Sequence, residues 1–406
     1  MKVIKFSGKT LEKVYSRLAK RKVRVKKKVE KILQDVRTKG DEALIYYSKK
    51  LDKATLTPRQ LKVSESETSE AYQNIDAAFI SSLKLAINNV TRFYKNQIKK
   101  SWKIKGEDGI TLGEIIRPLE KVGVYVPSGT APLVSSVYMS VLPAKIAGVE
   151  EIYLATPPNA NGEVNPYILA VANLLKVKAV YKLGGAQAIG AMAFGTKTVP
   201  KVDKIVGPGN DYVTEAKRQV FGYCAIDMLA GPSEVVIIAN NFANPAHVIA
   251  DLHAQAEHKN GIAILITTSK KLAFIVRKEV ANGFVIMVKN LEEAISVSNR
   301  IAPEHLEIMV KQPEKILKKI KNAGAVFVGA YSPVVLGDYI SGPSHVLPTS
   351  GTARFFSGLG TSDFMKSTHV ISYTKKALEK VAPAVEKIAS LEGMKKHMQS
   401  LKSRLE

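Results

Sequence analysis

EVVIIA (residues 234–239), AILITT (263–268), FVIMV (284–288), LEIMV (306–310) and AVFVG (325–329) are short β-branched runs that follow one another along the chain. Helical stretches separate them, beginning near Pro245, Lys270, Leu291 and Pro313. Strands that alternate with helices are typical of a parallel sheet covered by helices on both faces. This part of the chain therefore predicts an α/β unit.

A second series of the same kind lies upstream. Its strands are expected at VGVYV (122–126), EIYLAT (151–156), KAVYKL (178–183) and DKIVG (203–207). Its helices are expected at residues 135–147, 166–175, 186–193 and 213–220. Helical spacing of apolar residues predicts mostly helix over 8–104 and a basic helical tail over 375–405. The whole sequence thus predicts an α/β protein with two parallel sheets and helical extensions.

Composition narrows the class of protein. The chain has 406 residues, of which 46% are hydrophobic, so it is globular, with two to three domains at about 150 residues each. The single cysteine, Cys224, excludes an intramolecular disulfide and a multi-cysteine zinc site, which favours a cytoplasmic protein. No run of ~18 apolar residues occurs, so no membrane span is expected.

The formal charge of +24 raises the question of nucleic-acid binding. Residues 1–50 hold 17 Lys and Arg against 5 Asp and Glu, and therefore half of the excess. The run from Lys20 to Lys31 lacks interleaved aromatic residues, which argues against sequence-specific recognition. A solvated helical face is the favoured interpretation, with at most nonspecific binding to polyanions.

Three clusters could carry chemistry, and the first is DLHAQAEH (251–258). If this segment is a helix, Gln255 and His258 stand three residues apart and project from one face. An amide oxygen and an imidazole can both ligate a divalent metal. An exposed helix with two unrelated polar residues is the alternative.

The second cluster is IAPEHLEIMV (301–310), in which Glu304 and His305 follow a proline at the mouth of a predicted strand. At a sheet edge near the usual ligand position, this pair suits general acid–base work. The carboxylate would take a proton from water and the imidazole a proton from an alcohol. A salt bridge at the strand entrance is the alternative.

The third cluster, GDYISGPSHVLPTSGTARF (337–355), could place Asp338 as a metal ligand and His345 as a substrate contact. An ordinary turn-rich connection is the alternative. In the tail, LEGMKKHMQS (391–400) offers Glu392 and His397, which by themselves are more typical of a surface.

Three glycine-rich stretches each follow a predicted strand and lead into a helix, an arrangement that favours phosphate. They are YVPSGTAP (125–132), KLGGAQAIGAMAFG (182–195) and IVGPGNDYVTEAKRQ (205–219). None matches G-x-G-x-x-G with an acidic residue ~20 positions on, so the usual dinucleotide fingerprint is absent. The Walker pattern is absent too, which argues against an ATPase.

Taken together, these segments resemble the histidinol dehydrogenases. The likeness extends from the N-terminal helices to His397 and keeps the order and spacing of GVYVPSG, GGAQAIGAMAFGT, KIVGPGNDYVTEAKRQVFG, AGPSEVVIIA and IAPEHLE. It implies oxidation of L-histidinol through L-histidinaldehyde to L-histidine, the last step of histidine biosynthesis. Two NAD would be reduced, and one Zn²⁺ ion would be held per chain. The loop 127–136 and Leu229 depart from the family's usual pattern.

The resemblance also implies roles for single residues. The metal ligands would be Gln255, His258, Asp338 and His397, and the acid–base pair would be Glu304 and His305. The ligands and Glu304 match positions that also bind substrate, together with Ser233, His345 and Glu392. Tyr125, Gln187 and Asn210 match positions that line the NAD site.

With this resemblance, the chain is expected to divide into four parts. These are a helical extension (1–21), a Rossmann-like domain with the metal and catalytic residues (22–121 and 235–360), a Rossmann-like NAD domain (122–234) and a helical tail (361–406). The tail would complete the site of a partner subunit, which implies a cytoplasmic homodimer with shared active sites.

Two other functions remain as alternatives. One is an aldehyde dehydrogenase that uses Cys224 as nucleophile, although FGYCAIDML (221–229) reads as a strand and favours a buried structural thiol. The other is a basic nucleic-acid-binding protein on the same scaffold, which would act through the first 50 residues.

Overall fold

The computed structural model describes residues 1–5, 25–73, 75–128, 131–258 and 260–406. It consists of two compact units. Unit 1 comprises Met1–Gln97 and Leu119–Phe364, and unit 2 comprises Ile98–Pro118 and Met365–Glu406. Unit 1 contains a six-stranded and a five-stranded parallel sheet, and unit 2 contains an antiparallel sheet. The two parallel sheets confirm the predicted fold class.

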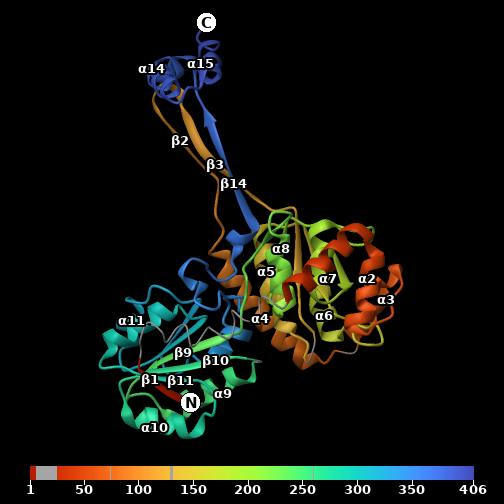
Figure 1. Cartoon of the computed structure of the whole chain (residues 1–406), viewed down its shortest axis with the longest axis vertical. Helices are drawn as coiled ribbons and strands as arrows, with labels where there is room; N and C mark the ends of the chain where they lie inside the picture. Colours follow the sequence, from red (N-terminus) through yellow and green to blue (C-terminus); the bar gives the residue numbers. More distant parts are fainter. Residues whose placement is uncertain (6–24, 74, 129–130, 259) are drawn as a thin grey trace. The chain divides into compact units, whose positions relative to one another are not determined.

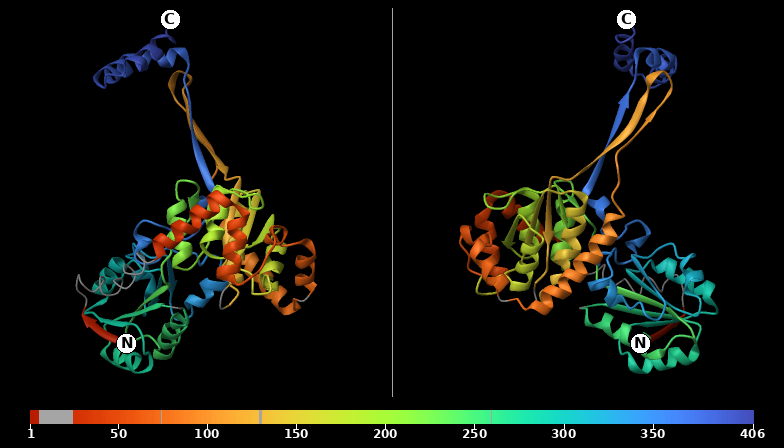
Figure 2. Two further views of the ribbon diagram at one scale, coloured as in Figure 1. Left: turned by 45° about the vertical axis from the view of Figure 1, so that its right-hand side comes forward. Right: turned by 180° about the vertical axis from the view of Figure 1, so that it is seen from behind.

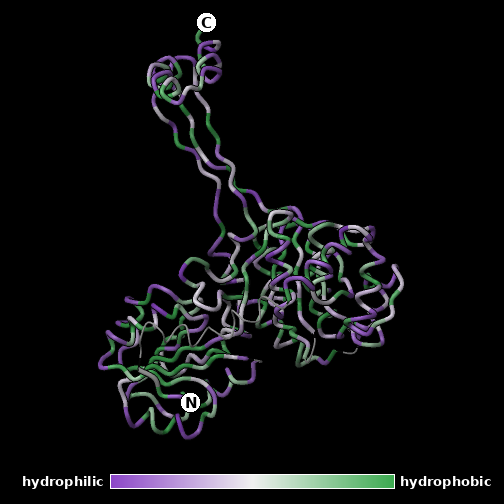
Figure 3. The backbone as a smooth tube through the Cα atoms, viewed as in Figure 1, coloured by the Kyte–Doolittle hydropathy of each residue, from purple (hydrophilic) through white to green (hydrophobic). Residues whose placement is uncertain are grey.

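The six-stranded sheet has the order β1-β11-β10-β9-β12-β13. Its strands are β1 (Lys2–Lys5), β9 (Glu234–Ala239), β10 (Ile262–Thr267), β11 (Phe284–Met287), β12 (His305–Met309) and β13 (Ala325–Val328). Helices α9 (Pro245–Glu257) and α10 (Lys270–Glu279) cover one face, and α11 (Leu291–Ile301) and α12 (Pro313–Leu317) cover the other (Figure 1). Because both faces are covered, β9, β10, β11 and β12 are mostly apolar (Figure 3), with Glu234, His305 and Glu307 as buried exceptions.

Capping residues place the starts of these helices. The side chains of Asn244, Ser269 and Asn290 accept hydrogen bonds from backbone N–H groups in the first turns of α9, α10 and α11. Such caps satisfy donors that have no partner inside the helix. The observed starts at Pro245, Lys270, Leu291 and Pro313 confirm the predicted ones.

The five-stranded sheet has the order β6-β5-β4-β7-β8. Its strands are β4 (Lys121–Tyr125), β5 (Glu151–Thr156), β6 (Ala179–Lys182), β7 (Lys204–Val206) and β8 (Ala225–Ile226). Its crossover helices are α5 (Val134–Ala147), α6 (Pro166–Leu174), α7 (Gly185–Phe194) and α8 (Asp211–Val220). The sheet lies between helical layers (Figure 2). Strand order reverses at β4, which has β5 on one side and β7 on the other.

The segments before β4 pack on this second sheet. A helix over residues 25–39 and α2 (Asp41–Tyr47) share a core with α7 and α8. The chain continues through η1 (Ser48–Asp52), η2 (Pro58–Leu61), α3 (Glu65–Gln73) and α4 (Ala77–Lys95). The sequence predicted that residues 22–121 form one domain with residues 235–360, whereas these early helices share a core with the five-stranded sheet. A buried stripe that includes Val29, Ile32 and Val36 attaches the helix to the five-stranded sheet.

The expected helical extension over 1–21 also differs from the structure where it is described. Residues Lys2–Lys5 form β1, which pairs in parallel with β11. The expectation for residues 6–24 lies outside the described part of the chain. Within the basic run, residues 26–28 are exposed, opposite the buried stripe. This placement agrees with a solvated helical face for the described part of that run.

Unit 2 is built on three antiparallel strands, β2 (Trp102–Lys105), β3 (Thr111–Pro118) and β14 (Met365–Ser372). The turn η3 (Glu107–Gly109) and helices α14 (Lys375–Leu391) and α15 (Lys395–Lys402) complete it. The helical prediction for the tail is correct over α14 and α15, but it is wrong over 365–372. All eight residues of β14 pair with β3, and the strand is largely exposed, so it shows no apolar pattern.

The remaining elements of unit 1 are α13 (Val334–Tyr339), η4 (Thr352–Arg354) and η5 (Thr361–Phe364). In the ranges that the structure describes, no helix is both long and apolar enough to cross a membrane.

Candidate active site

The predicted acid–base pair lies where the chain enters β12. Glu304 precedes the strand and His305 is its first residue, and both side chains are buried. This is the amino edge of the six-stranded sheet, whereas ligands of α/β proteins usually bind at the carboxyl edge. The prediction that the pair lies at a strand entrance is therefore confirmed. The prediction that it lies near the usual ligand edge of the sheet is not.

Hydrogen bonds from two neighbours hold Glu304 in place. Its Oε2 atom accepts a bond from the backbone N–H of Glu234 at 2.9 Å, and its carboxyl group also bonds the Ser233 side chain. Burial raises the pKa of Glu304 to about 8, and the negative charge of Asp338 adds to this increase. The carboxyl group therefore changes charge close to the physiological pH range, where a group that exchanges protons in catalysis must titrate.

His305 has a defined tautomer. Its Nδ1 atom lies 3.1 Å from the carbonyl oxygen of Glu234, which can only accept, so Nδ1 carries the proton. The Nε2 lone pair is consequently free, and Nε2 lies 3.9 Å from Oδ1 of Asp338. Burial lowers the pKa of His305, so the imidazole is neutral at physiological pH. A neutral imidazole with a free Nε2 can act as a base.

The salt-bridge alternative for this pair does not fit these environments. His305 Nδ1 and Glu304 Oε2 are 3.6 Å apart, close enough for an ion pair if both groups were charged. Burial, however, raises the pKa of Glu304 and lowers that of His305, and so favours the neutral form of each.

Asp338 and His345 are brought together by the loop after α13. The Nδ1 atom of His345 donates to the backbone oxygen of Asp338 at 2.9 Å. Its Nε2 atom lies 3.1 Å from the hydroxyl of Ser136, which must therefore donate. Since Ser136 belongs to α5, this bond links the loop to the five-stranded half of unit 1. Burial lowers the pKa of His345 and keeps it neutral.

Helix α4 supports the same loop. The buried hydroxyl of Tyr94 donates to the Leu359 carbonyl at 2.7 Å and accepts from the Ser344 N–H at 2.7 Å. The side chain of Asn89 donates to the Ile340 carbonyl at 3.0 Å. Sequence reasoning missed these residues and Ser136, because their partners lie more than two hundred positions away along the chain.

Gln255 and His258 are placed differently from the prediction. Gln255 is buried in the last turn of α9, and its Nε2 atom has no hydrogen-bond partner in the described structure. His258 caps the helix with extended backbone, so the two residues do not share a helical face. The helix ends at Glu257 for a local reason. The carbonyl of His258 accepts from the N–H of Gly261, and the chain turns there into β10.

The predicted ligands are only partly assembled. Burial is the main cause of the lowered pKa of His345, and His258 and His305 each lie close enough to His345 to lower it further. Among the described residues, no group of three or more His, Cys, Asp or Glu side chains is arranged to hold a metal ion. Glu392 and His397 belong to unit 2, where Glu392 caps α14, His397 lies on α15, and both are exposed.

The predicted cofactor residues lie at the carboxyl edge of the five-stranded sheet, near the reversal of strand order. Tyr125 ends β4, Gln187 lies in the first turn of α7, and Asn210 caps α8. This is the usual ligand position in an open α/β sheet. The Asn210 side chain accepts from the N–H groups of Tyr212 and Val213 at 3.0 and 3.2 Å.

Each glycine-rich stretch joins a strand to a helix, as predicted. Gly207, directly after β7, has a φ of +115°, and a Cβ atom there would lie 2.1 Å from the Tyr125 carbonyl oxygen. Only glycine allows the two chains to approach so closely.

A buried ion pair behind this loop was also missed. Lys217 of α8 and Asp227 after β8 are both buried and form a salt bridge. The Lys217 ammonium donates to the Gly207 carbonyl at 2.9 Å, and the Gly207 N–H donates to Asp227 at 2.8 Å. The ion pair thus forms hydrogen bonds with both the carbonyl and the N–H of Gly207. Charged residues at this spacing carry no sequence signal.

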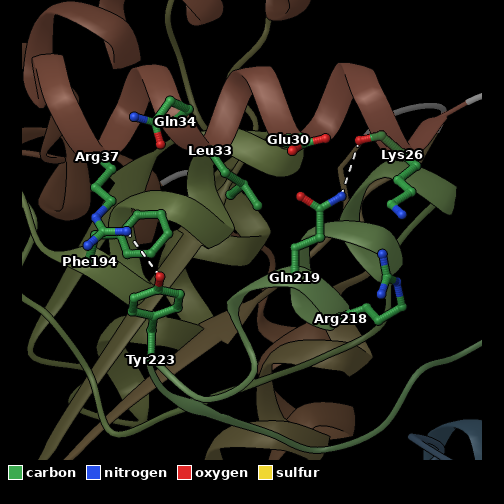
Figure 4. A pocket seen from close by; sticks show the side chains of 9 residues that line it. All are labelled: Lys26, Glu30, Leu33, Gln34, Arg37, Phe194, Arg218, Gln219 and Tyr223. Atoms are coloured by element: carbon green, nitrogen blue, oxygen red, sulfur yellow. Dashed lines mark hydrogen bonds between the residues drawn. The ribbon is translucent and has the colours of Figure 1, made fainter.

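Two other features lie apart from these sites. Cys224 is packed in the core of the five-stranded half, and burial raises the pKa of its thiol to about 11, which confirms the buried-thiol interpretation. An open cleft of about 620 Å³ contains none of the predicted site residues (Figure 4). In this cleft the Arg37 guanidinium donates to the Tyr223 hydroxyl at 3.0 Å.

The geometry and the comparisons define the family. Two parallel sheets covered by helices, one of them with a glycine-rich carboxyl edge, define the fold as α/β. Residues 15–405 match the family model for histidinol dehydrogenase. The chain therefore belongs to the histidinol dehydrogenase family and is an enzyme of the oxidoreductase class.

Individual relatives agree along the whole chain. Histidinol dehydrogenase from Listeria innocua is 48% identical over 397 residues, covering 93% of this chain and 92% of the relative. The enzyme from Bacillus cereus is 47% identical over 401 residues, covering 94% and 93%. The crystal structure of histidinol dehydrogenase from Elizabethkingia anophelis superposes with a TM-score of 0.90 at 36% identity, covering 100% of this chain and 98% of that one.

Proposed function

We propose that this enzyme oxidises L-histidinol through L-histidinaldehyde to L-histidine, the last step of histidine biosynthesis, with reduction of two NAD. The observation that carries the proposal is the pair at the entrance of β12. His305 is neutral with a free Nε2, and Glu304 has a pKa of about 8. The two oxidations need these two proton acceptors, one for an alcohol and one for water.

In the first oxidation His305 acts on the alcohol. Its Nε2 atom takes the hydroxyl proton, and bound NAD would supply the acceptor for the hydride that leaves the same carbon. The Nδ1–H bond to the Glu234 carbonyl fixes the ring orientation and holds the tautomer. Asp338, whose Oδ1 lies 3.9 Å from Nε2, stabilises the imidazolium that forms.

In the second oxidation Glu304 acts on water. The ionised carboxylate takes a proton from a water molecule as its oxygen attacks the aldehyde carbon. The resulting hydrate would yield the carboxylate product with release of protons, and a second NAD would supply the acceptor for its hydride. Burial of Glu304 strengthens its basicity, because a pKa of about 8 makes its carboxylate a better proton acceptor than an exposed one.

A divalent ion, for which we propose zinc, would be held by Gln255, His258 and Asp338 together with His397 of the partner subunit. Amide oxygen, imidazole nitrogen and carboxylate oxygen are ligands that zinc accepts. Gln255 is buried and its Nε2 atom has no hydrogen-bond partner in the described structure, so its amide could turn to present Oε1 to an ion without losing a bond from Nε2. When bound, the ion would fix the orientation of the substrate's imidazole and amine. Ser233, His345 and the partner subunit's Glu392 would complete the substrate contacts.

NAD would bind at the carboxyl edge of the five-stranded sheet, against Tyr125, Gln187 and Asn210. The glycine-rich turns before α7 and α8 support this position, because they lie at the carboxyl edge beside the reversal of strand order, where open α/β sheets usually bind ligands.

The homodimer is proposed from the surface of unit 2. Its strands and helices leave large apolar side chains exposed, among them Ile104, Ile371, Ile388 and Leu391, at 55%, 72%, 59% and 77%. An apolar surface of this kind favours burial against a second copy. Such a dimer would have two equivalent shared sites.

The direct test is NADH formation on adding L-histidinol to the purified protein, with and without a chelator. We expect activity that the chelator removes and that added Zn²⁺ restores. Absence of NADH formation by a zinc-loaded protein would contradict the proposal.

A further inference from the structure

We propose that Asp52 is a positioning residue of the cofactor site, and that it orients the Gln187 amide so that its oxygen accepts a hydrogen bond from NAD. This inference rests on the proposed function, which places Gln187 beside the cofactor. No sequence motif indicates Asp52, which lies 135 positions before Gln187 and ends the short helix η1.

Asp52 holds the turn between β6 and α7 at two points. Its Oδ2 atom accepts from Nε2 of Gln187 at 3.1 Å, and its carboxylate also accepts a bond from the backbone N–H of Gly184. A Cβ atom on Gly184 would lie 2.5 Å from Oδ1 of Asp52, so the turn and the carboxylate are closely fitted. Tyr125 holds the next residue, because its hydroxyl accepts from the N–H of Gly185 at 3.0 Å.

The chemistry of the carboxylate decides which way the amide points. An ionised carboxylate can only accept hydrogen bonds, so it selects the NH₂ end of Gln187 and turns Oε1 away from itself. Burial raises the pKa of Asp52 to about 6, so this group is ionised at neutral and alkaline pH.

The oxygen of Gln187 is left as an unused acceptor. Gln187 is fully buried, and within the described structure its Oε1 atom has no hydrogen-bond donor. A buried acceptor without a donor is unfavourable, and native structures seldom keep one without a reason. NAD carries the donors required, as ribose hydroxyl, carboxamide and adenine amino groups. Asp52 therefore prepares an acceptor for the cofactor rather than merely attaching η1 to α7.

The experiment compares Asp52→Asn, Gln187→Ala and the double variant by steady-state kinetics. Asparagine can present its own NH₂ group to the turn, so it no longer fixes the amide. We expect Asp52→Asn to raise KM for NAD about fivefold, the effect of one hydrogen bond, with kcat at saturating NAD and KM for histidinol unchanged. In the Gln187→Ala background the same substitution should have no further effect.

Asp41→Asn is the matched control. Asp41 also ties a helix of this layer to a distant loop, since it accepts from the Thr198 hydroxyl at 2.6 Å. It contacts no predicted cofactor residue. This variant should lower thermal stability and leave KM for NAD unchanged. Asp52→Ser, which is smaller and also removes the charge, should reproduce the kinetic effect if Asp52→Asn folds poorly.

The variants distinguish a wrong role for Asp52 from a wrong position for the cofactor. If Gln187→Ala raises KM for NAD but Asp52→Asn and Asp52→Ser do not, Asp52 has no positioning role. Additive effects in the double variant would equally overturn a role exerted through Gln187. If Gln187→Ala leaves KM for NAD unchanged, the proposed cofactor position itself is wrong, and the inference falls with it.

Discussion

Burial shifts the pKa values of Glu304 and His305, the two neighbours at the entrance of β12, in opposite directions. It raises the pKa of Glu304 to about 8 and lowers that of His305, because in each case the charged form loses solvation. Glu234 serves both residues: its N–H binds the carboxylate and its carbonyl sets the imidazole tautomer. Two proton acceptors of different strength thus arise from one strand entrance.

Replacing Glu304 should separate the two oxidations. Glu304→Gln keeps the size of the side chain but cannot take a proton from water. We expect aldehyde oxidation to fall by about 10²–10⁴-fold, the usual contribution of a general base, while hydride transfer from histidinol continues. Single-turnover NADH formation from histidinol and from histidinaldehyde measures the two steps.

Glu307→Gln is the control for this change. Glu307 is also a buried carboxyl of β12, and its pKa is also raised to about 8, but it bonds the N–H of Val334 and lies near Asp251. This variant should retain aldehyde oxidation. Equal losses in the two variants would show that Glu304 acts through the strand and not on water.

The raised pKa of Glu304 also predicts how stability depends on pH. A carboxyl whose pKa is near 4.5 when unfolded and about 8 when folded binds more protons in the native state over that interval. Its contribution to the free energy of unfolding therefore falls as pH rises from about 4.5 to 8. Glu304→Gln should remove this part of the decline.

Urea unfolding of the wild type and Glu304→Gln at pH 5, 6, 7 and 8 measures this difference. The variant should gain stability relative to wild type as pH increases. A difference that does not change with pH would mean that the native carboxyl titrates like an exposed one.

At the scale of elements, the alternation of β-branched runs with helical stretches made the two sheets predictable. These runs signal local structure, so the observed strands and the starts of α9, α10 and α11 agree with the sequence. Strand β14 has no such signal because it is largely exposed. The helical spacing of Gln255 and His258 failed for another reason, since α9 ends one residue before His258.

The sequence indicated which residues are candidates for the site, but it indicated less well where they lie and what they contact. Glu304 and His305 are adjacent in sequence, so one strand start places both. Their hydrogen-bond partners are Glu234, the first residue of the neighbouring strand β9, and Ser233 directly before it, and the pairing of β9 with β12 is a property of the sheet. Asp52 and Lys217 likewise gain their roles only through tertiary contacts.

The ion pair behind the Gly207 loop gives a prediction at this scale. Lys217→Met leaves Asp227 buried without its charge partner, which should cost about 3–5 kcal/mol of stability. Lys121→Met is the control, because Lys121 forms an exposed pair with Glu151 at 3.4 Å and should cost at most about 1 kcal/mol. Urea unfolding compares them. Similar small losses in both would mean that the buried pair does not secure the loop.

At the scale of the whole molecule, unit 2 carries His397 and Glu392 but exposes much apolar surface. The proposed dimer predicts complementation between two inactive variants, His305→Ala and His397→Ala. If sites are shared, one site of each mixed dimer carries both lesions and the other carries none. After subunit exchange, activity should approach about one quarter of wild type, as random pairing requires. No recovery despite demonstrated exchange would mean that each chain supplies its own His397.

We propose that one enzyme carries out both oxidations of histidinol. The most direct test of this claim is complete conversion of a limiting, known amount of L-histidinol with excess NAD, followed by measurement of NADH, histidine and free aldehyde. We predict two NADH and one histidine for each histidinol, with little aldehyde at any time. One NADH per histidinol with accumulated aldehyde would contradict the claim, because Glu304 would then not activate water in this protein.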